Sequence, residues 1–153
     1  MKLGIFQEVD AMKSYDAGCS CGSTRYRFTG IPRTVYACHC TECQKRTGSA
    51  FGLSMHISAS SFEILEGTPE EVAKPDGSVL QFCKKCSNCI VYKFSSEIYC
   101  IFPGHFDDTS WFNPVGNIWV RSAQPWVHID KRIKSYEKNP DYKELYQLYE
   151  QTS

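Results

Sequence analysis

Three cysteines fall within six residues in the stretch Cys38-His39-Cys40-Thr41-Glu42-Cys43. Cysteine thiolates are favoured zinc ligands, and three of them occupy all but one position of a tetrahedral zinc ion. No other cysteine lies close enough in the sequence to belong clearly to this group. An open position is typical of catalytic zinc, where water or a substrate binds. The stretch therefore predicts a catalytic zinc site held by Cys38, Cys40 and Cys43.

A histidine is the alternative fourth ligand, and the candidates are His39, His56 and His105. His39 suits this role poorly, because a residue between two ligating cysteines in an extended segment points away from their metal. His56 is sterically freer, but it lies on the polar side of an alternating strand pattern. If a histidine completes the shell, both metal sites of the chain are structural.

Two further cysteine pairs predict a second, closed zinc site. The pair in Cys19-Ser20-Cys21 lies on one side of an extended backbone, and Cys83-Lys84-Lys85-Cys86 has the C-x-x-C spacing that wraps a metal in a tight turn. Four thiolates leave no position for a substrate, so this site is expected to be structural. Cys89 keeps an alternative open, because it can replace Cys83 or Cys86 at the same spacing. The isolated Cys100 lies in an apolar run and is expected in the core.

The hydrophobic pattern, taken together with the predicted zinc sites, indicates a mainly β fold of folded antiparallel sheets built around zinc. The pattern from residue 23 to 28 alternates, and the clearest alternation places Phe51, Leu53, Met55 and Ile57 on one side of a strand and His56 on the other. A helical turn is expected over residues 41–46, ended by Gly48. Further strands are expected over residues 34–38, 62–65, 79–82, 90–94, 98–102 and 118–120.

A short helix is expected near the C-terminus. Asn139 is the predicted N-cap, with Pro140 at the first helical position. Four apolar or aromatic residues then fall on one face, which is expected to pack on the sheet: Tyr142, Leu145, Tyr146 and Tyr149. The sequence has no internal repeat or linker, so a single zinc-binding domain is expected over residues 1–153.

Charge and cysteine usage narrow the class of protein further. Lysine plus arginine equals aspartate plus glutamate at 17 each, so the chain lacks the basic excess typical of nucleic-acid binding. Residues 1–10 do not resemble a signal peptide, and no stretch is long and apolar enough to span a membrane. We therefore expect a cytoplasmic protein without nucleic-acid or membrane partners. Nine cysteines, an odd number, favour metal ligation over disulfides in such a compartment.

The three cysteine blocks closely resemble the glutathione-dependent formaldehyde-activating (GFA) family, which includes centromere protein V. The resemblance spans nearly the whole chain, and the order of the blocks makes it specific. It rests on Gly18-Cys19-Ser20-Cys21-Gly22, on residues 38–48 and on Phe82-Cys83-Lys84-Lys85-Cys86, and continues through residues 62–67, 117–120 and 125–126.

This resemblance implies a fold, two metal sites and an activity. The implied fold is the β-tent. The implied zinc sites are a structural one on Cys19, Cys21, Cys83 and Cys86 and a second on Cys38, Cys40 and Cys43. The implied activity is that of S-(hydroxymethyl)glutathione synthase, a carbon–sulfur lyase, with glutathione and formaldehyde as the leading thiol and aldehyde. The alternative is a non-enzymatic, zinc-stabilised interaction module of the centromere protein V type.

Two positions depart from the family pattern. Ser87 stands where the family usually has glycine after the second C-x-x-C, which is expected to be a tolerated turn change. Ala123-Gln124 replaces the usual arginine-containing pair before Pro125-Trp126. The second change removes a positive charge that an anionic substrate such as glutathione could use.

Overall fold

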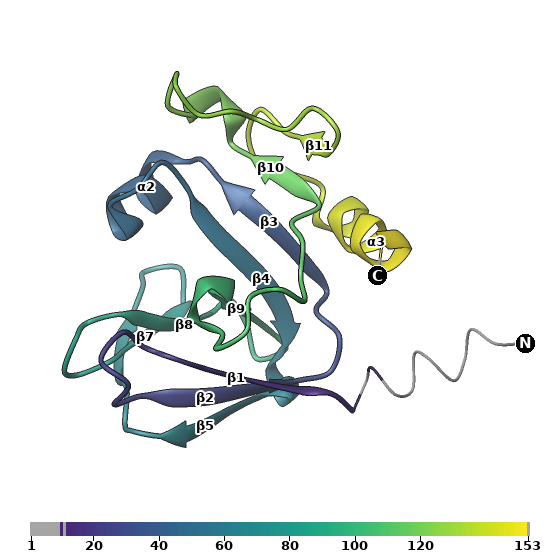
Figure 1. Cartoon of the computed structure of the whole chain (residues 1–153). Helices are drawn as coiled ribbons and strands as arrows, with labels where there is room; N and C mark the ends of the chain where they lie inside the picture. The colour runs from purple at the N-terminus through teal and green to yellow at the C-terminus, as the bar shows by residue number, and fades with distance from the viewer. Residues whose placement is uncertain (1–9, 11, 153) are drawn as a thin grey trace, which may run out of the picture. The chain divides into compact units, whose positions relative to one another are not determined.

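The computed structural model describes residue 10 and residues 12–152 (Figure 1). The expectation about residues 1–10 falls outside this part of the chain, except for Asp10. The chain folds into two compact units, one formed by Met1–Pro32 and His56–Ser110 and the other by Arg33–Met55 and Trp111–Ser153. The expectation of a single domain over residues 1–153 stays a prediction.

Seven strands among the described residues of the first unit pair antiparallel. Strand β2 (Arg25–Thr29) lies between β1 (Ser14–Gly18) and β5 (Phe62–Glu66). Four more strands pair in chain order, with short 3-10 turns at Ala59–Ser61 and Pro103–His105: β6 (Glu70–Ala73), β7 (Val79–Phe82), β8 (Cys89–Lys93) and β9 (Ile98–Ile101). The alternation predicted around β2 is confirmed, because Thr24, Tyr26 and Phe28 are buried while the residues between them are half-buried.

The second unit contains two helices and part of a larger sheet, in which its strands follow the order β11-β10-β3-β4. Strand β10 runs parallel to both β3 and β11. Figure 1 shows helix α3 beside β10 and β3. The elements are β3 (Thr34–Cys38), α2 (Thr41–Thr47), β4 (Gly52–Ser58, of which Gly52–Met55 belongs to this unit), β10 (Gly116–Ile118), a 3-10 turn (Val120–Ser122), β11 (Lys134–Ser135) and α3 (Tyr142–Thr152). The mainly β fold with a short C-terminal helix is thus confirmed.

Close packing explains one glycine of this unit. A Cβ atom at Gly116 would lie 2.7 Å from Cδ2 of Leu145, a distance that real side chains do not tolerate. Leu145 is fully buried and Tyr149 nearly so, whereas Tyr142 and Tyr146 are half-buried. The predicted packing face of α3 is therefore confirmed, and a glycine on β10 allows the helix to approach the sheet closely.

The predicted start of this helix is wrong by two residues. Helix α3 begins at Tyr142, and the Asp141 side chain caps it by accepting a hydrogen bond from the Lys143 amide at 3.0 Å. The Asn139 side chain instead accepts a hydrogen bond from Trp119 Nε1 at 2.8 Å. A tertiary partner for Asn139 thus leaves the capping role to the acidic residue that follows Pro140.

The prediction of a polar outer side for β4 is also wrong. Met55 and Ile57 are fully buried as expected, but Ser54 and His56 on the other side are buried too. The His56 ring packs edge-on against Phe94, with 5.2 Å between the ring centroids. Phe51, just before the strand, is 38% exposed. Both sides of the strand are covered, so the alternation does not separate core from solvent.

Candidate metal centres

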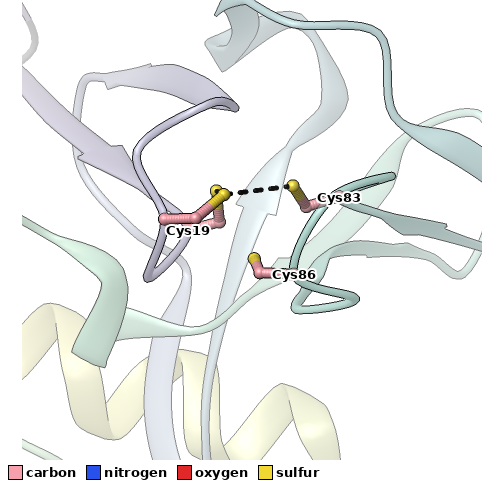
Figure 2. A group of neighbouring side chains, drawn as sticks. Cys19, Cys83 and Cys86 are labelled. Carbon is pink, nitrogen blue, oxygen red and sulfur yellow. Dashed lines mark hydrogen bonds between the residues drawn. The ribbon is translucent and has the colours of Figure 1, made fainter.

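Four cysteine sulfur atoms meet in the first unit. The Sγ atoms of Cys19, Cys21, Cys83 and Cys86 all lie within 4.8 Å of one another. Figure 2 shows Cys19, Cys83 and Cys86 converging from two loops. The Sγ–Sγ distances are 3.5 Å for Cys19–Cys21 and 3.8 Å for Cys21–Cys83. A tetrahedral zinc ion with Zn–S bonds of about 2.3 Å separates its sulfur atoms by about 3.8 Å, so this arrangement fits the ion.

Backbone hydrogen bonds shape the two loops that carry these sulfur atoms. The Gly22 amide donates to the carbonyl of Cys19 at 3.0 Å, and the Ser87 amide donates to the carbonyl of Cys83 at 2.9 Å. Asn88 joins the loops, because its Oδ1 accepts a hydrogen bond from the Ser20 amide at 2.7 Å. Asn88 was not predicted from the sequence, since its role depends on a contact with a residue 68 positions away.

The surroundings of Cys83 and Cys86 favour the thiolate form that binds metal, whereas the pKa of the exposed Cys21 thiol is raised. The Ser23 hydroxyl lies 3.2 Å from Cys83 Sγ, and this hydrogen bond is the main cause that lowers the pKa of the Cys83 thiol to about 5. The backbone amide of Asn88 is the main cause that lowers the pKa of Cys86. The fit of the donor set to zinc therefore rests on the geometry of all four sulfur atoms and on the lowered pKa values of Cys83 and Cys86.

The structure gathers Cys83 and Cys86 into this cluster rather than Cys89. Cys89 is the first residue of β8 and pairs with Phe82 across the ladder. The cluster therefore contains Cys83 and Cys86, the pair with the predicted C-x-x-C spacing. The expectation for Cys100 is confirmed, because its side chain is buried on β9.

Ser87 stands where the resembled family usually has glycine, and its backbone conformation is one that favours glycine. Its φ is +61°, a left-handed conformation that glycine adopts without strain and that costs other residues about 1–2 kcal/mol. Ser87→Gly is expected to raise the free energy of unfolding by up to about 1 kcal/mol, because glycine also loses more backbone entropy on folding. Chemical denaturation of the metal-loaded proteins measures the difference. A stability loss with Ser87→Gly would contradict this account, and Ser87→Ala, which keeps the strain, serves as the control.

Three cysteine sulfur atoms form a second cluster at the end of β3. The Sγ atoms of Cys38, Cys40 and Cys43 lie within 4.8 Å of one another. Cys40 is the N-cap of α2, and its Sγ accepts a hydrogen bond from the Cys43 amide at 3.3 Å. Helix α2 ends as predicted at Gly48, whose φ is +65°. The sequence thus encodes a strand, a thiol cap and one short helix that bring the three thiols together.

One thiol of this second cluster is the strongest acid. A hydrogen bond from Cys38 is the main cause that lowers the pKa of Cys43 to about 6, and the Arg46 guanidinium, whose Nη2 lies 3.5 Å from Cys43 Sγ, adds to the effect. The same hydrogen bond, in which Cys38 is the donor, raises the pKa of Cys38. Cys43 is therefore the thiol that most readily provides a thiolate. A metal cation that displaces the proton between Cys38 and Cys43 can then bind the other sulfur atoms as well.

No histidine belongs to either cluster in the part of the chain that the structure describes. His39 Nε2 instead lies 3.0 Å from Asn117 Oδ1, so the expectation that it points away from the cysteines is confirmed. His56 packs on Phe94, and His105 Nδ1 lies 3.4 Å from the Tyr26 hydroxyl. The second cluster thus has three sulfur donors, against four in the first.

Comparison with known proteins identifies the family. The family model described as glutathione-dependent formaldehyde-activating enzyme matches residues 14–122. The chain belongs to this GFA family. The match includes both cysteine clusters, so the resemblance carried by the cysteine blocks is confirmed. No curated protein sequence matches the chain.

A solved structure shares the fold of this chain. The crystal structure of a Rhodobacter sphaeroides protein is similar to the chain with a TM-score of 0.51 and 15% sequence identity. The similarity covers 65% of this chain and 91% of the Rhodobacter chain. At this identity the likeness concerns the fold alone.

No helix among the described residues has the length and apolar character needed to cross a membrane.

A pocket of about 470 Å³ lies beside helix α2 of this GFA protein. Its wall includes Gln44 and Lys45, which follow Cys43 directly, and the indole of Trp126, which is 76% exposed. Gln124 belongs to the pair Ala123-Gln124, which stands where an arginine-containing pair is expected. Its side chain donates to Gln44 Oε1 at 3.1 Å and accepts from Trp126 Nε1 at 2.7 Å. Gln124 therefore fixes the pocket wall without adding a charge.

Proposed function

We propose that this protein is a zinc-dependent carbon–sulfur lyase of the GFA type, which joins a small thiol to a small aldehyde. Glutathione and formaldehyde are the leading substrates. One observation carries the proposal: the second cluster offers three sulfur donors to a metal, whereas the first offers four. A metal that prefers four ligands keeps one position for a substrate only in the second cluster.

Zinc suits both clusters, because soft thiolate ligands in a tetrahedral arrangement select it. In the proposal, Cys19, Cys21, Cys83 and Cys86 hold a structural zinc ion, and Cys38, Cys40 and Cys43 hold a catalytic one. When bound, the second ion supplies a Lewis acid that keeps a substrate thiol deprotonated at neutral pH.

The reaction adds the thiol across the aldehyde carbonyl. A sulfur–carbon bond forms, the carbon–oxygen double bond becomes a single bond, and the thiol proton ends on the new hydroxyl. Cys38, Cys40 and Cys43 hold the site, and Arg46 donates toward the sulfur of Cys43. Lys45 lies in the wall of the neighbouring pocket, where its charge can attract a carboxylate of the thiol substrate.

A rate measurement tests this function. Metal-loaded protein is expected to accelerate the formation of S-(hydroxymethyl)glutathione from glutathione and formaldehyde, followed by NMR of the new methylene group. Cys100→Ser, outside both clusters, is the control and should keep the acceleration. If the protein leaves the uncatalysed rate unchanged for glutathione and for other small thiols, the interaction-module alternative replaces the lyase.

Location in the cytoplasm and the absence of nucleic-acid partners remain part of the proposal.

A further inference from the structure

A second cleft of about 520 Å³ lies in the same unit as the three-cysteine cluster but on another side of β3. It is lined by Ala37 and His39, which alternate along the chain with Cys38 and Cys40. Residues that alternate in an extended segment point to opposite sides, so this cleft is distinct from the side where the three sulfur atoms meet. Asn117, which is paired with Ala37 on the neighbouring β10, also lines it.

His39, one of the residues that line the cleft, carries a buried polar atom without a hydrogen-bond partner in the described structure. His39 is only 1% exposed, and its Nε2 lies 3.0 Å from the amide oxygen of Asn117. An amide oxygen accepts, so Nε2 donates, and a neutral imidazole that donates from Nε2 has an acceptor at Nδ1. His39 Nδ1 is buried and has no hydrogen-bond partner in the described structure. A buried acceptor without a partner destabilises the folded state, so a group that donates to it would be bound favourably.

The remaining walls of the cleft define what fits there. The Phe51 ring lies 5.2 Å from the His39 ring, and Leu53, Pro114, Val127 and Ile133 add apolar surface. The two opposite charges in the wall neutralise each other, because Arg132 Nη2 lies 2.7 Å from Asp130 Oδ2. The wall therefore favours an uncharged ligand with an apolar body.

We propose that this cleft binds a neutral small molecule with an aromatic or aliphatic body and one hydroxyl or N–H group, which donates a hydrogen bond to His39 Nδ1. Apolar walls with a few convergent polar groups are typical of small-molecule sites. The hydrogen bond satisfies the buried acceptor, and Asn117 holds the ring in the orientation that presents it. This site is independent of the proposed lyase function.

Naphthol and its methyl ether test the proposal, because they share the apolar body and differ in the donor. Metal-loaded protein is expected to bind naphthol about tenfold more tightly than the ether, the value of one hydrogen bond to a buried acceptor. The nitrogen NMR resonance of His39 Nδ1 should shift with naphthol and not with the ether. Equal affinity for both compounds, or binding of neither, would overturn the proposal.

A pair of variants locates the contact. His39→Phe keeps a ring of similar size and removes the acceptor, so it should abolish the preference for naphthol over the ether. His128→Phe, at an exposed position of the same wall, is the matched control and should keep the preference. If His39→Phe folds and retains the tenfold preference, the proposed contact is wrong. If it does not fold, the Nδ1 resonance of the unmodified protein decides the matter.

Discussion

Replacing Cys83 with serine is expected to lower the free energy of unfolding by about 4–5 kcal/mol or more, enough to unfold much of the protein. Cys83 is buried and lies in a C-x-x-C turn whose sulfur atoms meet Cys19 and Cys21 from a distant part of the chain. Loss of one thiolate removes the metal that links these segments, and binding energy at such a site is folding energy. Circular dichroism during thermal unfolding measures the loss.

Cys89→Ser is the matched control, because Cys89 lies six residues away and outside the cluster. It should retain both metals and lose much less stability. A Cys83→Ser protein as stable as Cys89→Ser would show that the four-sulfur cluster does not stabilise the fold.

Replacing Cys43 with serine is expected to leave a folded protein that lacks the second metal and has lost at least about a hundredfold in activity. Cys43 supplies the most acidic thiol of its cluster, and its replacement leaves only Cys38 and Cys40. The four-sulfur cluster is untouched, so the stability loss should stay well below that of Cys83→Ser. Metal analysis, thermal unfolding and the NMR rate assay give the three readouts.

Cys100→Ser controls for the burial of a hydroxyl, since Cys100 is also buried but belongs to neither cluster. It should lose some stability and keep both metals and the activity. Equal and large stability losses in Cys43→Ser and Cys83→Ser would indicate two structural sites and favour the interaction module.

The cysteine clusters were the most predictable part of the structure, because their geometry is set by short spacings. A strand end, a thiol cap and the turn ended by Gly48 place Cys38, Cys40 and Cys43 together with few long-range contacts. The pairing of Cys19 and Cys21 with Cys83 and Cys86 joins distant segments, but the number of ligands that zinc needs restricts the choice. Because zinc needs four ligands, this tertiary contact between the two cysteine pairs could be predicted from the sequence.

Elements that depend on tertiary pairing were not predicted. Strand β6 (Glu70–Ala73) is exposed along its whole length and β1 contains Ser14, Asp16 and Gly18, so neither has a strong strand pattern. Asp16 pairs with Arg27 of β2 at 2.6 Å, a contact that only the fold reveals. The burial of His56 and the contact of Asn139 with Trp119 were missed for the same reason, because each depends on a distant aromatic partner.

In the proposed function, the three-cysteine cluster holds a metal with one position open to a substrate thiol. Cobalt can replace zinc at both clusters, and its absorption reports how many thiolates surround it. Glutathione is expected to change the sulfur-to-cobalt charge-transfer absorption of the unmodified protein, because its sulfur adds a fourth thiolate, and to cause no change in Cys43→Ser. An unchanged spectrum at millimolar glutathione, with both clusters loaded, would contradict the assignment of glutathione to this site.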